Sequence, residues 1–415
     1  MDSTICLTGG AVFDGEHLLE RGSVLFSEEG ILEVVEGDRV PRGTVTLDAG
    51  GRLIMPGLVD LHSDALEQSI EMRPGVYFDF EFALRNLDCR IASCGITTYC
   101  HALSFADNEL GLRSPGEVER IIRMVKAFDR SSGAMARHLV HARYEIGAEE
   151  GLKVLTGLLD EGLIDMVSVM DHTPGQGQFT TLGAFVDYYA GTCGDAYEEI
   201  VGMAHRKVTC QEAGWKALSS LSSRVSAEGL PFLSHDDDTP EKIGLVKVLG
   251  AGASEFPLSI DAAERAVEEG LKVFMGAPNL VRGRSSGGHL KAAETVSRGI
   301  CDGLLSDYYP ECMLQAPFTA MESLNTLPEY ALSLVTSGPG RFIRPGLGTL
   351  TPGEVADLLV VDHTEPWARI VQSWVGGRMV HYAAPGIKGG EGVPDCVTET
   401  VEGGGPRHER HHPAA

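Results

Sequence analysis

Eight short apolar runs recur along the middle of the chain, and they constrain the fold more than any other feature. The runs are continuous rather than alternating, as expected for strands buried on both faces. In chain order they are LVDLHSD, GITTYCHAL, RHLVHARYE, DMVSVMDH, LPFLSHDDD, GASEFPLS, LKVFMGAPN and CDGLLSDYY. Segments with helical periodicity lie between them, such as residues 118–130 and residues 260–269. We therefore predict an α/β fold in which residues 57–345 form a (β/α)8 TIM barrel.

Both ends of the chain carry short β-rich runs broken by Gly and Asp turns. Residues 1–56 and residues 346–383 share this pattern. Two such segments at opposite ends of a chain can pair, so we predict that they form one small β-sandwich domain. Residues 384–415 contain repeated Gly and no apolar periodicity, which predicts a flexible tail.

The overall composition excludes several classes of partner. A net charge of −25 argues against nucleic acid and acidic membranes, although it leaves room for a locally basic pocket that binds an anionic small molecule. No apolar run approaches the roughly 18 residues that cross a bilayer, and no signal peptide is evident. The nine cysteines form no Cys-x-x-Cys pair, which indicates reduced thiols. We expect a cytoplasmic protein with a small-molecule substrate. Assembly into a homo-oligomer is possible, and the sequence does not decide it.

Candidate metal ligands follow several of the predicted strands. The carboxyl ends of barrel strands meet at one mouth, where the chemistry gathers. The candidates there are His62, Asp64, Glu145, His172, His235 and Asp307. Imidazole together with carboxylate suits zinc, manganese or iron. One such residue alone is more often a structural hydrogen-bonding group, but five strand ends together predict metal binding.

Six candidate ligands exceed the three that one catalytic ion needs, which indicates two divalent metal ions. Two ions about 3.5–4 Å apart can share a carboxylate, and Glu145 is the natural bridge. Asp307 is the predicted catalytic residue, because it can bind a metal and accept a proton from the attacking water. We expect zinc, with manganese or iron as alternatives.

The motifs resemble the amidohydrolase superfamily. HSDALE, MRP, MDHTPGQGQF, SHDD, EFP, MGAPNLVRG and SDYYP look like the diphosphatase family of phosphonate degradation, the carbon–phosphorus lyase pathway. The resemblance covers about residues 54–312. It implies a hydrolase that removes diphosphate from α-D-ribose 1-methylphosphonate 5-triphosphate, and it places the family's metal ligands on the same six residues.

Other polar residues near the predicted mouth are candidates for binding substrate. Residues 281–294 offer arginines, a Ser/Gly-rich turn and the start of a helix, which suits phosphate, although a loop with solvated arginines is the alternative. This loop departs from the family pattern, because its histidine stands three residues further on. The substrate-binding candidates are Arg73, Arg143, Gln176, Asn279, Arg282, Ser286 and His289.

Four more residues near these strand ends have open roles. We expect His141 to lie deeper in the barrel than Arg143, in a supporting role. Asp236 could orient His235 or His172. Cys100 and His101 are expected to end the second strand near the mouth, where Cys100 packs rather than reacts.

We interpret the chain as a binuclear metal-dependent hydrolase that acts on a triphosphate. The alternative is hydrolysis of a C–N bond in a cyclic amide, an acylated amine or a deamination substrate, because the same metals can direct water at carbon. The net charge slightly favours this alternative, whereas Arg73, Arg282 and Arg284 favour phosphate. A barrel that only stores or senses metal is a third interpretation, and Asp307 argues against it.

Overall fold

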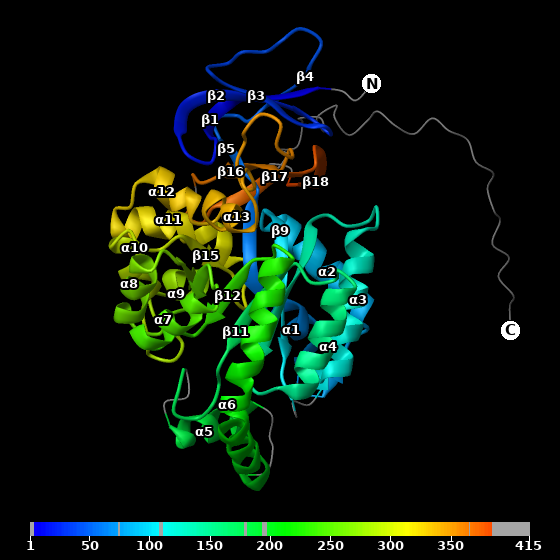
Figure 1. Cartoon of the computed structure of the whole chain (residues 1–415). Helices are drawn as coiled ribbons and strands as arrows, with labels where there is room; N and C mark the ends of the chain where they lie inside the picture. Colours follow the sequence, from blue (N-terminus) through cyan, green and yellow to red (C-terminus); the bar gives the residue numbers. More distant parts are fainter. Residues whose placement is uncertain are drawn as a thin grey trace, which may run out of the picture. The chain divides into compact units, whose positions relative to one another are not determined.

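Eight parallel strands form a barrel that is surrounded by helices in the computed structural model (Figure 1). The structure describes residues 4–73, 75–107, 111–177, 181–192, 197–364 and 366–383. Every apolar run singled out above overlaps one of the barrel strands. They are β6 (Leu58–Ser63), β9 (Ile96–Phe105), β10 (Arg137–Glu145), β11 (Met166–Met170), β12 (Phe232–His235), β13 (Ala253–Glu255), β14 (Lys272–Gly276) and β15 (Gly303–Leu305).

The barrel closes where its last strand meets its first. Seven neighbouring pairs are parallel ladders, whereas β15 and β6 meet through the single bridge between Ser63 and Asp307. There the Asp307 amide donates to the His62 carbonyl oxygen at 3.0 Å, and the Ser306 amide donates to the Asp60 carboxylate at 3.0 Å. We call this junction the seam of the barrel. It places the residues after β15 directly beside the end of β6.

The two ends of the chain form a second sheet, which we call the terminal sheet and which is seen in Figure 1 as blue and orange strands. Its β5 pairs with β1 on one side and with β16 on the other, so N-terminal and C-terminal segments share one sheet. The rings of Phe26 and Trp374 meet at 5.0 Å, although three strands separate β2 from β17 in the hydrogen-bonded order, so the sheet folds back around a core of its own. The predicted fold class is confirmed. The strands are β1 (Ile5–Phe13), β2 (Leu18–Ser27), β3 (Gly30–Glu36), β4 (Val45–Asp48), β5 (Leu53–Pro56), β16 (Leu358–Asp362), β17 (Arg369–Val375) and β18 (Arg378–Tyr382).

Helices cover the outside of the barrel (Figure 1), and several of them bury one face against it. The predicted helix at residues 118–130 is α3, and its Val118, Ile121, Ile122, Val125 and Phe128 are all buried. Two helices, α5 and α6, follow β11 and stand apart from the regular alternation. The helices are α1 (Ala65–Ile70), α2 (Phe80–Ser93), α3 (Pro115–Asp129), α4 (Glu149–Asp160), α5 (Leu182–Thr192), α6 (Tyr197–Ala227), α7 (Pro240–Val248), α8 (Ile260–Glu268), α9 (Ala277–Arg282), α10 (Ala292–Ser297), α11 (Cys312–Leu324), α12 (Pro328–Ser333) and α13 (Ser337–Ile343). A hairpin of β7 (Glu71–Arg73) and β8 (Val76–Tyr77) follows α1.

The second barrel strand runs further than the sequence predicted. Because residues 102–105 are also buried, β9 continues to Phe105, and Cys100 and His101 lie within the strand rather than at its end. Cys100 packs inside the barrel, where burial raises the pKa of its thiol well above the ordinary value. His101 contacts His138 of β10 instead of the mouth.

The predicted tail, residues 384–415, lies outside the described residues. Within the described part of the chain, no helix has the length and apolar character needed to cross a membrane.

Candidate metal centre

The first candidate metal group lies across the seam of the barrel. His62 is near the end of β6, Asp64 follows that strand, and Asp307 follows β15. The Asp64 amide donates to the Asp307 carbonyl oxygen, so the backbone itself brings these side chains together. One donor atom from each of the three lies within 4.8 Å of the others. Asp307 takes a left-handed backbone conformation with φ of 57°, which turns the chain immediately after its strand.

The second candidate group joins the segments that follow β11 and β12. It consists of His172, His235 and Asp236, whose donor atoms also lie within 4.8 Å of one another. The Asp236 Oδ2 atom is 3.8 Å from His172 Nε2 and 3.6 Å from His235 Nε2. Asp236 has φ of 52°, a left-handed conformation that is uncommon for residues other than Gly. This turn places the carboxylate close to both imidazoles, and the predicted role of Asp236 in orienting one of them stays a prediction.

The two groups are neighbours. The rings of His62 and His235 stack with centroids 5.2 Å apart and planes 13° apart. Each group supplies three protein ligands of imidazole and carboxylate type, the set that catalytic zinc sites use while keeping a position open. The donor chemistry therefore fits two divalent ions side by side.

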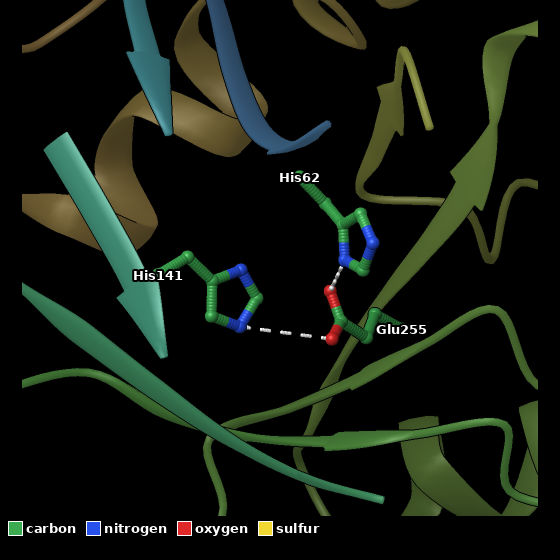
Figure 2. Close-up of side chains that lie close together, drawn as sticks. All are labelled: His62, His141 and Glu255. Carbon is green, nitrogen blue, oxygen red and sulfur yellow. Dashed lines mark hydrogen bonds and ion pairs between the residues drawn. The ribbon is translucent and has the colours of Figure 1, made fainter. Parts of the chain in front are cut away.

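A third group lies at the base of these two and was not predicted. His62, His141 and Glu255 bring donor atoms within 4.8 Å of one another (Figure 2). Glu255 ends β13 and is completely buried. Burial alone would raise its pKa, but the neighbouring His62 and His141 and the hydrogen bonds from His235 and His62 hold the pKa well below the ordinary value. The EFP motif contains this residue, yet nothing in its letters indicates where the side chain points.

His141 has a supporting place beside this carboxylate. Its Nδ1 donates to the Leu61 carbonyl oxygen at 2.8 Å, and its Nε2 accepts from the Ser168 hydroxyl at 2.8 Å. Burial lowers the pKa of His141 to about 4, so the ring is neutral at neutral pH. This deep position agrees with the role expected for it from strand geometry.

Glu145 contacts His172, but it belongs to none of the candidate groups found among the described residues. His172 Nδ1 lies 2.9 Å from one Glu145 oxygen, and Lys207 Nζ of α6 lies 2.8 Å from the other. Burial would raise the pKa of Glu145, yet Lys207 and His172 outweigh it and keep the pKa far below the ordinary value. The carboxylate therefore orients His172 in this geometry, and the bridging role stays a prediction.

Two arginines face the first group. Arg143 is buried, and its guanidinium lies 3.3 Å from Asp64 Oδ1 and 3.0 Å from His235 Nε2. Arg113 is partly exposed and is held by Glu67 at 2.9 Å, with one nitrogen 3.9 Å from Asp64. Arg143 was singled out from the sequence. Arg113 was not, because it lies outside any strand and any recognised motif.

The remaining substrate-binding candidates lie in several different places. The side chain of Asn279 holds the segment that leads into α10. Its Nδ2 donates to the Leu290 carbonyl oxygen, and its Oδ1 accepts from the Ala292 backbone N–H. Arg282 is exposed and contacts both Ser286 and the hydroxyl of Tyr308, the residue after Asp307.

Three candidates have no place in the candidate metal groups described above. Gln176 lies in the turn after His172, where its backbone N–H donates to the Thr173 carbonyl oxygen. His289 is half-buried in the loop between α9 and α10. Arg73 is exposed at the end of β7. The positions of these three residues do not show whether they contact substrate, so their assignment to substrate binding stays a prediction.

Asp307 is a half-buried carboxylate with a raised pKa. Burial raises its pKa to about 7, and the nearby Asp64 carboxylate adds to the shift. A pKa near the working pH suits a general acid or base.

Comparison with known proteins places these features in a family. The chain is 31% identical over 373 residues to the α-D-ribose 1-methylphosphonate 5-triphosphate diphosphatase of Escherichia coli K12, an alignment that covers 85% of this chain and 96% of that protein. The chain belongs to the amidohydrolase superfamily. No family model matches it.

More distant matches also cover nearly the whole chain. A dihydroorotase of Trichlorobacter lovleyi is 21% identical over 443 residues, which cover 93% of this chain and 98% of that protein. A solved amidohydrolase structure superposes with a TM-score of 0.60 at 16% identity, covering 92% of this chain and all of the other. This member of the superfamily is therefore a metal-dependent hydrolase with candidate metal groups of histidine and carboxylate side chains at its barrel mouth.

Proposed function

We propose that the chain is a binuclear metal-dependent diphosphatase that cleaves a ribose 1-phosphonate 5-triphosphate to the 5-phosphate and diphosphate. The observation that carries the proposal is the pair of adjoining three-residue groups at the barrel mouth, joined by the stacked rings of His62 and His235. Zinc fits the imidazole and carboxylate donors, and manganese or iron fit them as well.

The chain's own residues divide the work of hydrolysis in this proposal. The bound ions supply Lewis-acid chemistry, which lowers the pKa of water and offsets charge at phosphorus. Asp307 accepts the proton of the attacking water, since its carboxylate lies in the first group and its pKa is raised to about 7. Arg113 at the rim offers a guanidinium to the phosphate chain, while Glu67 keeps it in place.

The similarity to the Escherichia coli diphosphatase supports a triphosphate substrate, and the two arginines beside Asp64 agree with an anionic ligand. A second candidate is hydrolysis of a C–N bond, which the weaker similarity to a dihydroorotase favours. Both reactions need the same metals and the same proton acceptor. They differ in the charge of the substrate that the mouth must hold.

The test is a direct comparison of substrates. We would purify the protein, measure bound metal, and follow the ribose triphosphate by ³¹P NMR beside dihydroorotate and N-acylated amines. We expect diphosphate to be released only when metal is present. Hydrolysis of the amides without release of diphosphate would assign the chain to the second candidate, and a metal-loaded but inert protein would contradict both.

A further inference from the structure

We propose that Glu255 is a positioning residue shared by both metal groups, one carboxylate that holds one histidine of each group in the same tautomer. The inference rests on the proposed binuclear site. It concerns a residue to which the proposed reaction gives no role, and it explains how two groups on different strands are kept in register.

The carboxylate contacts both rings at once. One Glu255 oxygen lies 2.9 Å from His62 Nδ1, and the other lies 3.0 Å from His235 Nδ1. Figure 2 shows the first of these contacts, with His141 on the other side of the carboxylate. Glu255 is completely buried at the end of β13, next to β12, so its position depends on the barrel rather than on a loop. A carboxylate on a buried strand end is well suited to positioning other side chains.

The hydrogen-bond partners fix where the protons lie on these rings. An ionised carboxylate can only accept, so both Nδ1 atoms must carry hydrogen. His235 gives independent support, because a guanidinium can only donate and Arg143 lies 3.0 Å from His235 Nε2. His235 Nε2 is therefore an acceptor, and its proton is on Nδ1. The lone pair of His235 is therefore on Nε2, and the neutral form of His62, with its hydrogen on Nδ1, likewise has its lone pair on Nε2.

Those two Nε2 atoms are the ones directed at the carboxylates of the metal groups. His62 Nε2 lies 3.7 Å from Asp64 Oδ1, and His235 Nε2 lies 3.6 Å from Asp236 Oδ2. A metal-binding histidine usually donates its other ring nitrogen to a carboxylate, which fixes the tautomer and strengthens the ligand. Here a single carboxylate does this for two histidines of two groups. Loss of one oxygen should therefore affect the two ions unequally.

Glu255→Gln tests this asymmetry. An amide offers one acceptor oxygen and one NH₂ donor, so the variant side chain can hold only one of the two rings in the required tautomer. We expect the wild type to retain two ions of similar affinity. The variant should retain one ion and bind the second at least about tenfold more weakly, as measured by metal content after equilibration with a chelator series.

The matched control is Glu354→Gln, which removes the same charge from the ion pair with Arg344 near the terminal sheet. It should keep two ions of wild-type affinity.

His141→Gln separates this proposal from direct metal binding by the third group. We expect two ions in that variant too, because His141 already uses both nitrogens for Leu61 and Ser168. Two ions of unchanged affinity in Glu255→Gln, or loss of an ion in His141→Gln, would overturn the proposal.

A second measurement needs no variant. In the metal-free protein labelled with ¹⁵N-histidine, His62 and His235 should both show the Nδ1–H tautomer, and protonation of Nε2 alone on either neutral ring would overturn the assignment. This readout is independent of turnover. A protein that has both tautomers and binds two ions but releases no diphosphate would refute the proposed substrate while leaving the role of Glu255 intact.

Discussion

At the scale of single residues, Asp307 combines two properties that its neighbours do not share. It lies in the first metal group, and burial raises its pKa to about 7. We expect Asp307→Asn to reduce kcat by about 10²–10⁴-fold, because the amide cannot accept the proton of water. Steady-state kinetics on protein with verified metal content would measure this. The control is Asp302→Asn, which removes a carboxylate that pairs with Lys272. A fully metal-loaded Asp307→Asn protein with activity near the wild-type level would contradict the assigned role.

Arg113 is the residue through which the choice of substrate can be tested. Glu67 holds its guanidinium close to Asp64 at the rim of the site. A hydrogen bond to a charged group is worth about 1.5–3 kcal/mol, so Arg113→Met should raise KM for the triphosphate by roughly 10–100-fold, with a smaller effect on kcat. Arg113→Lys should recover part of the loss. Arg120→Met on α3 serves as a control, since Arg120 is exposed and pairs with Glu117. An unchanged KM in Arg113→Met would exclude this contact.

At the scale of elements, α6 reaches the metal centre through Lys207. The ammonium pairs with Glu145 of β10, and Glu145 contacts His172. Removal of the ammonium leaves a buried carboxylate without its main counter-charge, so Lys207→Met should weaken metal binding at the second group by about 10–100-fold. Arg206→Met changes the adjacent, exposed residue and should leave metal binding unchanged. Equal metal affinity in the two variants would show that α6 does not support the site.

A buried chain of side chains joins α2 to two barrel strands. Asp88 of α2 accepts from His138 Nε2 at 3.0 Å, and His138 Nδ1 in turn accepts from His101 Nε2 at 2.9 Å. Burial, with a further contribution from His138, lowers the pKa of His101 well below the ordinary value. The folded protein therefore keeps His101 neutral, whereas the unfolded chain binds a proton at an ordinary pKa of about 6.5.

The sign of the pH effect follows from that difference. Below about pH 6.5, His101 is protonated in the unfolded state but stays neutral in the folded state. The free energy of unfolding therefore falls as the pH falls. We expect His101→Gln to lower the thermal midpoint at about pH 7.5, through the lost hydrogen bond, and to flatten the decline between about pH 6.5 and pH 5. His17→Gln at the exposed surface should reproduce the wild-type profile. A decline just as steep in His101→Gln would assign the acid sensitivity to other groups.

The same elements show what could be predicted from the sequence and what could not. The eight barrel strands were predictable because strands that are buried on both faces have continuous apolar sequences. His62, His172 and Asp307 could be expected at the mouth because each one ends or follows such a run. Glu255 could not, because β13 has only three residues and a carboxylate there is indistinguishable from a polar strand end. Lys207 lies 62 residues from Glu145, and no local pattern indicates that α6 folds back onto β10.

At the scale of the whole molecule, the metal centre lies where the barrel is least continuous. The other neighbouring strands are joined by parallel ladders, whereas β15 meets β6 through the bridge between Ser63 and Asp307. The first metal group takes His62 and Asp64 from one side of this seam and Asp307 from the other. Bound metal should therefore hold the barrel closed as well as prepare it for hydrolysis.

Removal of metal tests this coupling between closure and chemistry. A site whose ligand is about 100-fold above its Kd stabilises the fold by about 2.7 kcal/mol, so chelation should lower the thermal midpoint and readdition of zinc or manganese should restore it. Hydrogen exchange should increase most at β6 and around Asp307, because the ions link those segments directly. Strand β3 of the terminal sheet is the control within the same molecule and should change little, because its Ile31 and Val34 pack in that sheet's own hydrophobic cluster. Equal increases in both regions, or none at the seam, would mean that the barrel closes without help from the metals.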